Sequence, residues 1–394
     1  MIVLFLEWQS IGNEDVKDAF RNLKSEGMDI ECYSYDFDNH IDDDNKDYKK
    51  KLIGEIKKRS PDFVFSFNYF PIASKACNEV GVKYVSWVYD NPAIRLYSYT
   101  LINKCNYVFV FDSQMYETFV SQGIKNVFYL PMASAVERYD NVVLSDKERK
   151  KYSSQISFVG SLYSEDHNYY DEMKKKLPEY TKGYLEGIIR AQMEIDGLNI
   201  VEQSLTSKII DDMVDALGAK PGYDSVASYE YLYSNYVINR KITSLERTEI
   251  ISMLGEKYGL YLYTKEKTFS PGKIKNKGEV DYYREMPYVF KCSDINLNIT
   301  LRSIQKGIPL RIMDIFGCGG FLITNYQEDL LRFFVPGEDY VYYESREDLT
   351  DKIDYYIEHV DERKRIAESA YSKVKREHTY KHRLKEIITV VIDK

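Results

Sequence analysis

The sequence predicts an α/β protein made of two facing Rossmann-like domains, each built around a doubly wound parallel sheet. Its 394 residues exceed the roughly 250–300 residues that one hydrophobic core organises, so two domains are expected. Short β-rich runs alternate with helical segments, which is typical of parallel βα units. Several of these runs are apolar on both faces, as in a sheet that helices cover on both sides.

The first 150 residues contain the signals of one such domain. Asn13 can cap a helix that Gly27 stops, and Pro71 opens a second helix that Gly81 closes. Strands are expected at Ile2–Leu6, Asp29–Tyr35, Asp62–Phe67, Lys83–Trp87, Tyr107–Phe111 and Val127–Leu130. We therefore predict an N-terminal Rossmann-like domain over residues 1–150.

The second domain is expected at residues 151–375, because the charged stretch Ser145–Tyr152 interrupts the pattern before it restarts. Residues from about 163 to 258 are mostly helical in character and predict a helical insertion in this domain. Strands resume at Gly259–Tyr263, Asp294–Asn298, Phe321–Thr324 and Tyr340–Tyr343. A helical segment is predicted over residues 376–394.

Charge and cysteine content exclude several classes of protein. The 54 basic and 62 acidic residues give a net charge of −8, which disfavours nucleic acid as a partner but permits a single diphosphate. The apolar run Ile2–Leu6 is too short for a signal peptide or a membrane span, so we expect no transmembrane segment and a cytoplasmic protein. The five cysteines form no C-x-x-C pair and suggest neither disulfides nor a zinc site.

The segment Ile295–Asn325 carries the strongest functional signal. Its order of strand, polar loop, glycine turn, short helix, glycine turn and strand builds a ligand site at a strand's carboxyl end. Arg302 and Arg311 supply cations for a diphosphate, and Asp314 supplies a carboxylate for a ribose. Alternatively, Arg311 and Asp314 form a surface pair worth about 0.2–0.5 kcal/mol.

Other candidate donor-binding residues also follow predicted strands. Gly160 and Ser161 form a small-residue turn where backbone N–H groups can approach a phosphate. Thr264 ends the next strand, where backbone groups commonly meet a nucleotide base. Asn298 and Thr300 could bond sugar hydroxyls. Each also has an alternative without function. Gly160 and Ser161 could serve turn geometry, Thr264 could end a plain core strand, and Asn298 and Thr300 could satisfy the loop backbone.

Asp90 is the candidate catalytic residue of the first domain. It lies in Trp87–Pro92, directly after a β-rich run, and could act as a general base or as a sugar ligand. An Asp-Asn-Pro turn explains the same residues without function. No metal site is expected, because the D-x-D of Asp36–Asp38 is a chance occurrence among 62 acidic residues and His378 and His382 lack a third ligand.

The order of these segments resembles bacterial GT-B glycosyltransferases of the spore-maturation CgeB/YkvP-like group with their associated N-terminal domain. The segments that carry the resemblance are SWVYDNP (86–92), NYVFVFD (106–112), NVFYLPMA (126–133), SFVGSLY (157–163), VDYYREMPYVFKCSDINLNIT (280–300), GIPLRIMDIFGCGGFLITN (307–325) and HTYKHRL (378–384). Together they span nearly the whole chain, with the helical insertion the least diagnostic part.

The resemblance implies transfer of a sugar from a nucleotide-diphosphate donor, a UDP-sugar first of all, to a glycan or protein acceptor without metal or other cofactor. The second domain would hold the donor, with Asp314 on its ribose, and the first would lie on the acceptor side. Related enzymes commonly carry two glutamates seven residues apart, and here Gly307 and Asp314 stand in their places. This departure leaves the stereochemical outcome open. It also keeps two alternatives, a sugar-nucleotide epimerase and a non-catalytic nucleotide- or glycan-binding protein.

Overall fold

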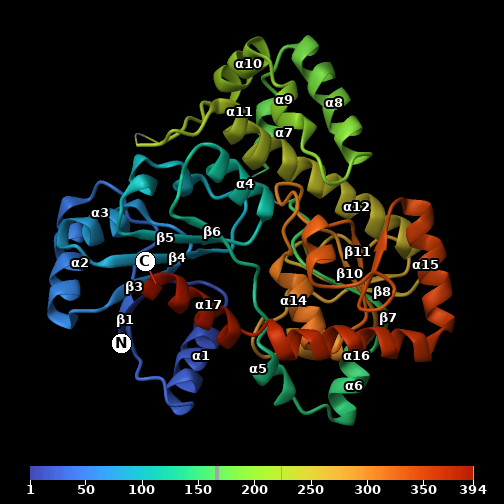
Figure 1. The fold of residues 1–394 in the computed structure, drawn as a ribbon. Coiled ribbons are helices and arrows are strands. Elements are labelled where there is room, and N and C mark those ends of the chain that lie inside the picture. The colour runs from blue at the N-terminus through green and yellow to red at the C-terminus, as the bar shows by residue number, and fades with distance from the viewer. Residues whose placement is uncertain (165–167, 223, 394) are drawn as a thin grey trace. The chain divides into compact units, whose positions relative to one another are not determined.

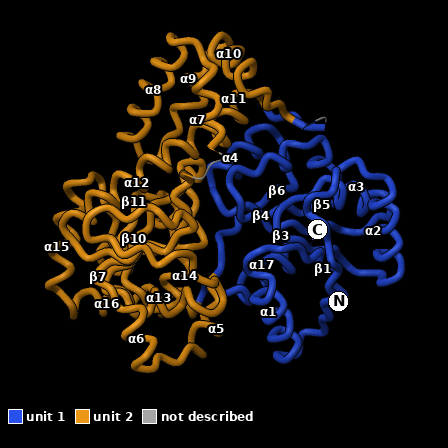
Figure 2. The backbone as a smooth tube through the Cα atoms, turned by 180° about the vertical axis from the view of Figure 1, so that it is seen from behind, with its two compact units in different colours: residues 1–133, 222–227, 377–394 blue, residues 134–221, 228–376 orange. Residues whose placement is uncertain are grey.

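The computed structural model describes residues 1–164, 168–222 and 224–393, and it contains two compact units (Figures 1 and 2). Unit 1 comprises residues 1–133, 222–227 and 377–394, and unit 2 comprises residues 134–221 and 228–376. Each unit is organised around one parallel six-stranded sheet. Within the described ranges, no helix combines the length and apolarity needed to cross a membrane.

The sheet of unit 1 has the strand order β2-β1-β3-β4-β5-β6, and every neighbouring pair is parallel. Its strands are β1 (Ile2–Glu7), β2 (Glu31–Asp36), β3 (Phe63–Phe67), β4 (Lys83–Val88), β5 (Asn106–Val110) and β6 (Val127–Tyr129). β3 and β5 are buried along their whole length, as their apolar sequences predict. The direction of winding reverses between β1 and β3.

The helices of unit 1 are α1 (Asn13–Ser25), α2 (Lys46–Arg59), α3 (Pro71–Val80), α4 (Ser113–Ser121) and α17 (Tyr380–Asp393), with short 3₁₀ turns at Ile94–Tyr97 and Tyr99–Ile102. Pro71 begins α3 and Gly81 ends it in the left-handed conformation, so both predicted signals are confirmed. The predicted cap at Asn13 is wrong. Asn13 is the first helical residue and donates its side-chain amide to the Trp8 carbonyl (2.6 Å), while Gly12 holds the cap position.

The sheet of unit 2 has the order β12-β11-β10-β7-β8-β9, again all parallel. Its strands are β7 (Ser154–Val159), β8 (Leu260–Tyr263), β9 (Ile274–Asn276), β10 (Ser293–Asn298), β11 (Leu322–Asn325) and β12 (Val341–Tyr343). β9 was not predicted, because three residues with one buried side chain give no periodic signal. The direction of winding reverses between β7 and β10, and this topological switch point is where such sheets bind ligands.

The predicted helical insertion lies between β7 and β8. It contains α7 (Tyr169–Lys174), α8 (Glu179–Met193), α9 (Ile200–Ser204), α10 (Ser207–Leu217), α11 (Tyr229–Leu232), a π-helix (Tyr233–Ile238) and α12 (Asn239–Lys257). Helices α7–α10 form a cluster at one end of unit 2, and α12 runs from that cluster to the sheet (Figure 1). The remaining helices of unit 2 are α5 (Val136–Asp140), α6 (Asp146–Tyr152), α13 (Met286–Cys292), α14 (Leu310–Gly317), α15 (Arg346–Glu358) and α16 (Val360–Glu377), with a 3₁₀ turn at Glu328–Arg332.

The compact units divide the chain at other positions than the ranges 1–150, 151–375 and 376–394 expected from sequence. Residues from Ser134 onward join unit 2, because Tyr139 donates to Asp314 (2.6 Å) and Tyr152 donates to Glu285 (2.8 Å). α17 belongs to unit 1, where it packs on α1. The charged stretch Ser145–Tyr152 thus contains the surface helix α6, and the boundary between the compact units lies before it.

We predict that Gly317→Ala lowers stability, because α14 packs tightly on the start of unit 2. A methyl group at Gly317 would overlap the Oγ of Ser134 and press on the ring of Tyr139. Overpacking of this kind typically costs about 1–3 kcal/mol. The measurement is the midpoint of urea denaturation.

The matched control is Gly187→Ala on the exposed face of α8, where an added methyl group meets no atom within 4 Å. This change should stabilise the protein by about 0.5–1 kcal/mol, because alanine restricts the unfolded chain. Equal midpoints for the two variants would contradict the packing argument.

Candidate functional site

The carboxyl ends of β7 and β10 lie side by side at the switch point of unit 2. The two strands pair in register, with Phe158 opposite Leu297. Gly160 and Ser161 therefore leave the sheet beside Ile299 and Thr300. These four residues frame the place where a doubly wound sheet opens to a ligand.

Arg247 of α12 spans these two strand ends. Its Nη1 donates to the Ser161 carbonyl (2.6 Å), and its Nε and Nη2 donate to the Ile299 carbonyl, the former at 3.0 Å. The residue is only 8% exposed, and its guanidinium lies over the rings of Phe158 and Tyr163. Among the described residues, no carboxylate forms an ion pair with it. Arg247 thus holds a buried positive charge with no carboxylate in ion-pair contact among the described residues.

Arg311 of α14 contributes a second cation to the same place. Its side chain is 27% exposed and lies 3.5 Å from the Asp314 carboxylate through Nη1. Burial lowers the pKa of the Arg247 guanidinium, and the positive charge of Arg311 also lowers it, while Tyr163 and the negative charge of Glu246 act in the opposite direction. Two cations that repel each other beside a switch point form a place where an anion is stabilised.

Asp314 was predicted to hold a ribose, and its carboxylate is engaged inside unit 2. It accepts hydrogen bonds from the hydroxyl groups of Tyr139 (2.6 Å) and Tyr282 (2.9 Å), and its side chain is 1% exposed. Burial raises the pKa of Asp314 to about 6, although Arg311 and the two tyrosines lower it. Local sequence patterns did not predict these two tyrosines, because they lie 175 and 32 residues away from Asp314 in the chain.

Arg302 was predicted to face a diphosphate, but its charge is neutralised within the protein. Its Nε donates to the Glu246 carboxylate (2.8 Å) and its Nη1 donates to Asp196 (2.5 Å) and to the Ile195 carbonyl (2.8 Å). Asp196 follows α8, so the arginine ties the helical insertion to the end of β10. This geometry assigns Arg302 to holding the insertion in place.

The predicted residues Ser161 and Thr264 bind one carboxylate that was not predicted, that of Glu266. Glu266 accepts hydrogen bonds from the hydroxyl groups of Ser161 (3.2 Å) and Thr264 and from the backbone N–H of Leu162 (3.0 Å). The N–H of Gly160 donates to the Tyr263 carbonyl (3.0 Å). These groups fix the loops after β7 and β8 to each other.

Asn298 and Thr300 link the ends of β10 and β11. The side-chain amide of Asn298 donates to the hydroxyl groups of Thr300 and Thr324, both at 2.9 Å. The N–H of Thr300 donates to the Asn325 side chain (2.8 Å). Both predicted residues are buried, at 5% and 2% exposure, so their part is to hold the ends of β10 and β11 together under the site.

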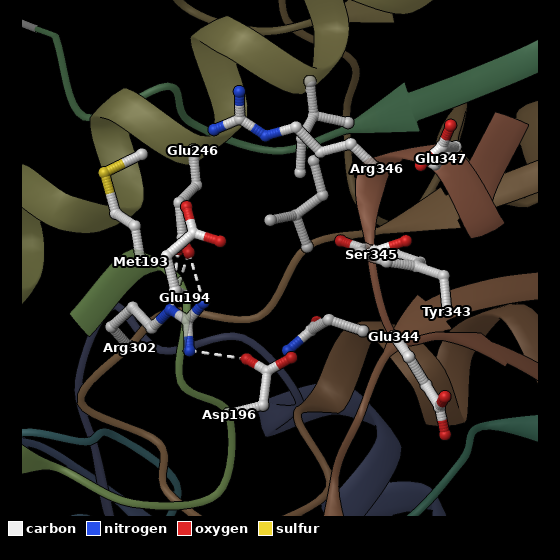
Figure 3. Close-up of a pocket in the computed structure, with 13 residues that line it drawn as sticks. Met193, Glu194, Asp196, Glu246, Arg302, Tyr343, Glu344, Ser345, Arg346 and Glu347 are labelled. Carbon is white, nitrogen blue, oxygen red and sulfur yellow. Dashed lines mark hydrogen bonds and ion pairs between the residues drawn. The ribbon is translucent and has the colours of Figure 1, made fainter. Parts of the chain in front are cut away.

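A cavity of about 360 Å³ opens beside Arg302 in unit 2 (Figure 3). Its walls come from the end of α8, from α12, from the ends of β10, β11 and β12, and from the start of α15. The lining residues are Met193, Glu194, Asp196, Glu246, Ile250, Ile299, Arg302, Asn325, Tyr343, Glu344, Ser345, Arg346 and Glu347. No sequence signal pointed to this cavity, because its residues come from segments far apart in the chain.

Asp90 of unit 1 lies at the carboxyl end of β4, as predicted. The Asn68 side-chain amide donates to the Asp90 carboxylate (2.6 Å), and its carbonyl accepts the N–H groups of Tyr89 (3.1 Å) and Asp90 (3.3 Å). Burial raises the pKa of the Asp90 carboxyl, and the bond from Asn68 lowers it. The rings of Trp8 and Tyr89 stack beside it, with centroids 6.3 Å apart. Asn68 directly follows β3 and was not predicted.

The two histidines considered as metal ligands have structural partners. His378 contacts Arg383, and the Nδ1 of His382 lies 2.8 Å from the Thr379 hydroxyl. In the part of the chain that the structure describes, no group of three or more His, Cys, Asp or Glu residues is placed to hold a metal ion.

Comparison with known proteins shows the fold to which this site belongs. Residues 243–389, less than half of the chain, are similar to the family described as glycosyl transferase-like. The matched range contains Arg247, Arg302, Arg311 and Asp314. A search of curated protein sequences finds no match.

Solved structures match the chain over nearly its whole length. One is a glycosyltransferase from Rickettsia africae, at 13% identity and a TM-score of 0.56, covering 100% of this chain and 98% of that one. A second is HepE of Anabaena, solved with UDP and glucose, at 11% identity and a TM-score of 0.53 with 100% of both chains covered. A third is a sucrose-phosphate synthase from Thermosynechococcus elongatus, at 8% identity and a TM-score of 0.56, covering 100% of this chain and 98% of that one.

These identities are low, so the likeness defines the fold. The chain has two parallel six-stranded sheets with surrounding helices, as in GT-B glycosyltransferase structures. The predicted fold class is confirmed.

We predict that Asp314→Asn changes how stability depends on pH. The folded-state pKa of about 6 lies above the ordinary value of 3.8, so the native state binds more protons than the unfolded state between these values. Ionisation of Asp314 therefore removes up to about 3 kcal/mol of stability as the pH rises from about 4 through about 6. The asparagine variant should lack this loss in urea denaturation at pH values across that interval.

Asp215→Asn, a change of an exposed carboxylate on α10, serves as the control and should keep the wild-type loss. Parallel pH profiles for wild type and Asp314→Asn would contradict the burial of an ionisable carboxyl at this position.

Proposed function

We propose that the protein is a metal-independent glycosyltransferase that takes a sugar from a nucleotide diphosphate, with a UDP-sugar as the first candidate, and passes it to a glycan or protein acceptor. One observation carries the proposal. Arg247 places a buried cation, without a carboxylate in ion-pair contact among the described residues, at the topological switch point of unit 2.

The chemistry of diphosphate departure fits this arrangement. A guanidinium has five N–H donors, and the Ser161 and Ile299 carbonyls take three from Arg247. The remaining donors can bind phosphate oxygens. Negative charge grows on the leaving diphosphate as the bond to the sugar breaks, so fixed cations there stabilise the transition state. Arg247 and Arg311 would supply this charge in place of a metal ion.

The other predicted residues take supporting parts in this proposal. Gly160, Ser161 and Thr264 hold the loops around the phosphates, and Asn298 and Thr300 set the end of β10. Asp314 reaches a ribose only if a ligand displaces a tyrosine hydroxyl, so its part is to position Arg311 until then. In unit 1, Asp90 would act on the acceptor, since its raised pKa brings a carboxylate nearer to the range of a general base.

Several comparisons support the choice of substrate and class. The Anabaena HepE structures contain UDP, UDP-glucose, or UDP and glucose. The glycosyl transferase-like match covers the segment with both arginines. We further propose membership of the CgeB/YkvP-like group and action in the cytoplasm, for which the five free cysteines are suited.

The proposal predicts that UDP stabilises the protein without divalent metal in a thermal-shift screen against UDP, GDP, TDP and their sugar conjugates. Arg247→Gln and Arg311→Ala should each weaken nucleotide binding about 10- to 100-fold, because each removes a charged hydrogen-bond donor to phosphate. Binding is measured by calorimetric titration of the nucleotide that gives the largest shift.

Arg190→Ala, on the exposed surface of α8, is the matched control and should bind like wild type. Unchanged nucleotide affinity in both Arg247→Gln and Arg311→Ala would contradict the assignment of these two arginines to a diphosphate site. Turnover of the donor without any acceptor would favour the epimerase, and binding without turnover would favour a non-catalytic protein.

A further inference from the structure

The cavity beside Arg302 does not share the chemistry of the switch point. Five carboxylates line it, from Glu194, Asp196, Glu246, Glu344 and Glu347, against the two guanidinium groups of Arg302 and Arg346, which leaves a formal charge of −3. Figure 3 shows that these acidic side chains come from both the insertion side and the α15 side. The lining therefore repels a diphosphate and attracts a cation.

The charges inside the cavity are only partly compensated. Arg302 forms ion pairs with Glu246 and Asp196, which both line the cavity. Arg346 forms an ion pair with Glu249, which does not line it. The side-chain carboxylates of Glu194 and Glu347 form no hydrogen bond or ion pair with any described residue. Two of the five lining carboxylates thus have no positively charged partner among the described residues.

Tyr343 gives an independent indication of a ligand. It ends β12 at 6% exposure and lines the cavity, yet its hydroxyl makes no hydrogen bond within the described ranges. The negative charges of Glu246 and Asp196 act on this hydroxyl, so it lies toward the acidic wall of the cavity. The residue is buried while its hydroxyl has no partner within the protein, so a donor or acceptor group of a bound ligand would satisfy that hydroxyl.

The shape of the acidic lining favours an organic cation over a metal ion. The carboxylates are spread around about 360 Å³, and no cluster of acidic or histidine ligands among the residues searched is close enough for a metal. Met193, Ile250 and Ile299 supply apolar surface for a carbon body. The space corresponds to on the order of ten water molecules, which is within the range of small-molecule sites.

We propose that this cavity binds a small organic ammonium ion, that is, a protonated amine whose carbon skeleton is no larger than that of a monosaccharide. Glu194 and Glu347, the two lining carboxylates without a partner among the described residues, attract the ammonium group. The Tyr343 hydroxyl binds a polar group of the ligand, and the carbon body rests on Ile250 and Ile299. Ile299 also gives its carbonyl to Arg247, so the cation site adjoins the proposed phosphate site on the end of β10. The proposal does not depend on glycosyl transfer.

The test uses amines paired with neutral analogues of the same shape: D-glucosamine with D-glucose, 1,4-diaminobutane with 1,4-butanediol, and 2-phenylethylamine with 2-phenylethanol. Ligand-detected NMR titrations of the full chain measure each dissociation constant at a pH where the amines are protonated. At least one amine should bind about tenfold more tightly than its neutral partner, and added salt should reduce the difference. No preference for any amine would overturn the proposal.

Variants locate the binding. Glu194→Gln and Glu347→Gln should each weaken the preferred amine about three- to tenfold, and Tyr343→Phe should weaken it without loss of fold. Glu358→Gln, an exposed change at the other end of α15, is the matched control. Amine binding that survives the double change of Glu194 and Glu347 overturns the assignment. Nucleotide titrations of the same variants report separately on the proposed function.

Discussion

The guanidinium of Arg247 joins the two strand ends on which the ligand chemistry of unit 2 depends. It crosslinks the carbonyl after β7 to the carbonyl after β10, so one side chain holds the switch point of the sheet together. Carbonyl dipoles and the faces of Phe158 and Tyr163 offset part of the solvation that burial removes. No carboxylate within the described chain is in ion-pair contact with this guanidinium, so its positive charge is not neutralised by direct pairing.

Two arginines near the same end of β10 have opposite roles because their partners differ. Arg302 is surrounded by Glu246 and Asp196, which neutralise it and make it a tie between the insertion and the sheet. Arg247 has no carboxylate in ion-pair contact among the described residues, so in our proposal it binds an anion. The carboxyl edge of the sheet therefore carries two different sites. The guanidinium of Arg247 lies at the ends of β7 and β10, and the acidic cavity lies at the ends of β10, β11 and β12. Ile299 belongs to both, since its carbonyl binds Arg247 and its side chain lines the cavity.

Local signals predicted much of the fold because they act within a few residues. Pro71 begins α3 and Gly81 ends it through backbone geometry that needs no distant partner. The apolar runs of β3 and β5 reflect burial on both faces of the sheet. Asn13 shows the limit of such reasoning. Its side-chain oxygen, the atom that would cap α1, accepts a hydrogen bond from the Ser10 hydroxyl, and its side-chain amide donates to the Trp8 carbonyl. Likewise, the charged stretch before β7 turned out to be the surface face of α6, whose Tyr152 binds Glu285.

The sequence by itself determined the two α/β sheets, because strand and helix periodicity place residues without knowledge of contacts. It placed Gly160 and Thr300 just after the carboxyl ends of their strands and Arg311 and Asp314 on the helix between β10 and β11. Only the tertiary structure decided which charges stay available. Arg247 lies 86 residues from Ser161 and 52 from Ile299, and Glu246 lies 56 from Arg302. Whether a buried charge is neutralised depends on partners within a few ångströms in space, and the packing of α12 against the strand ends sets those distances.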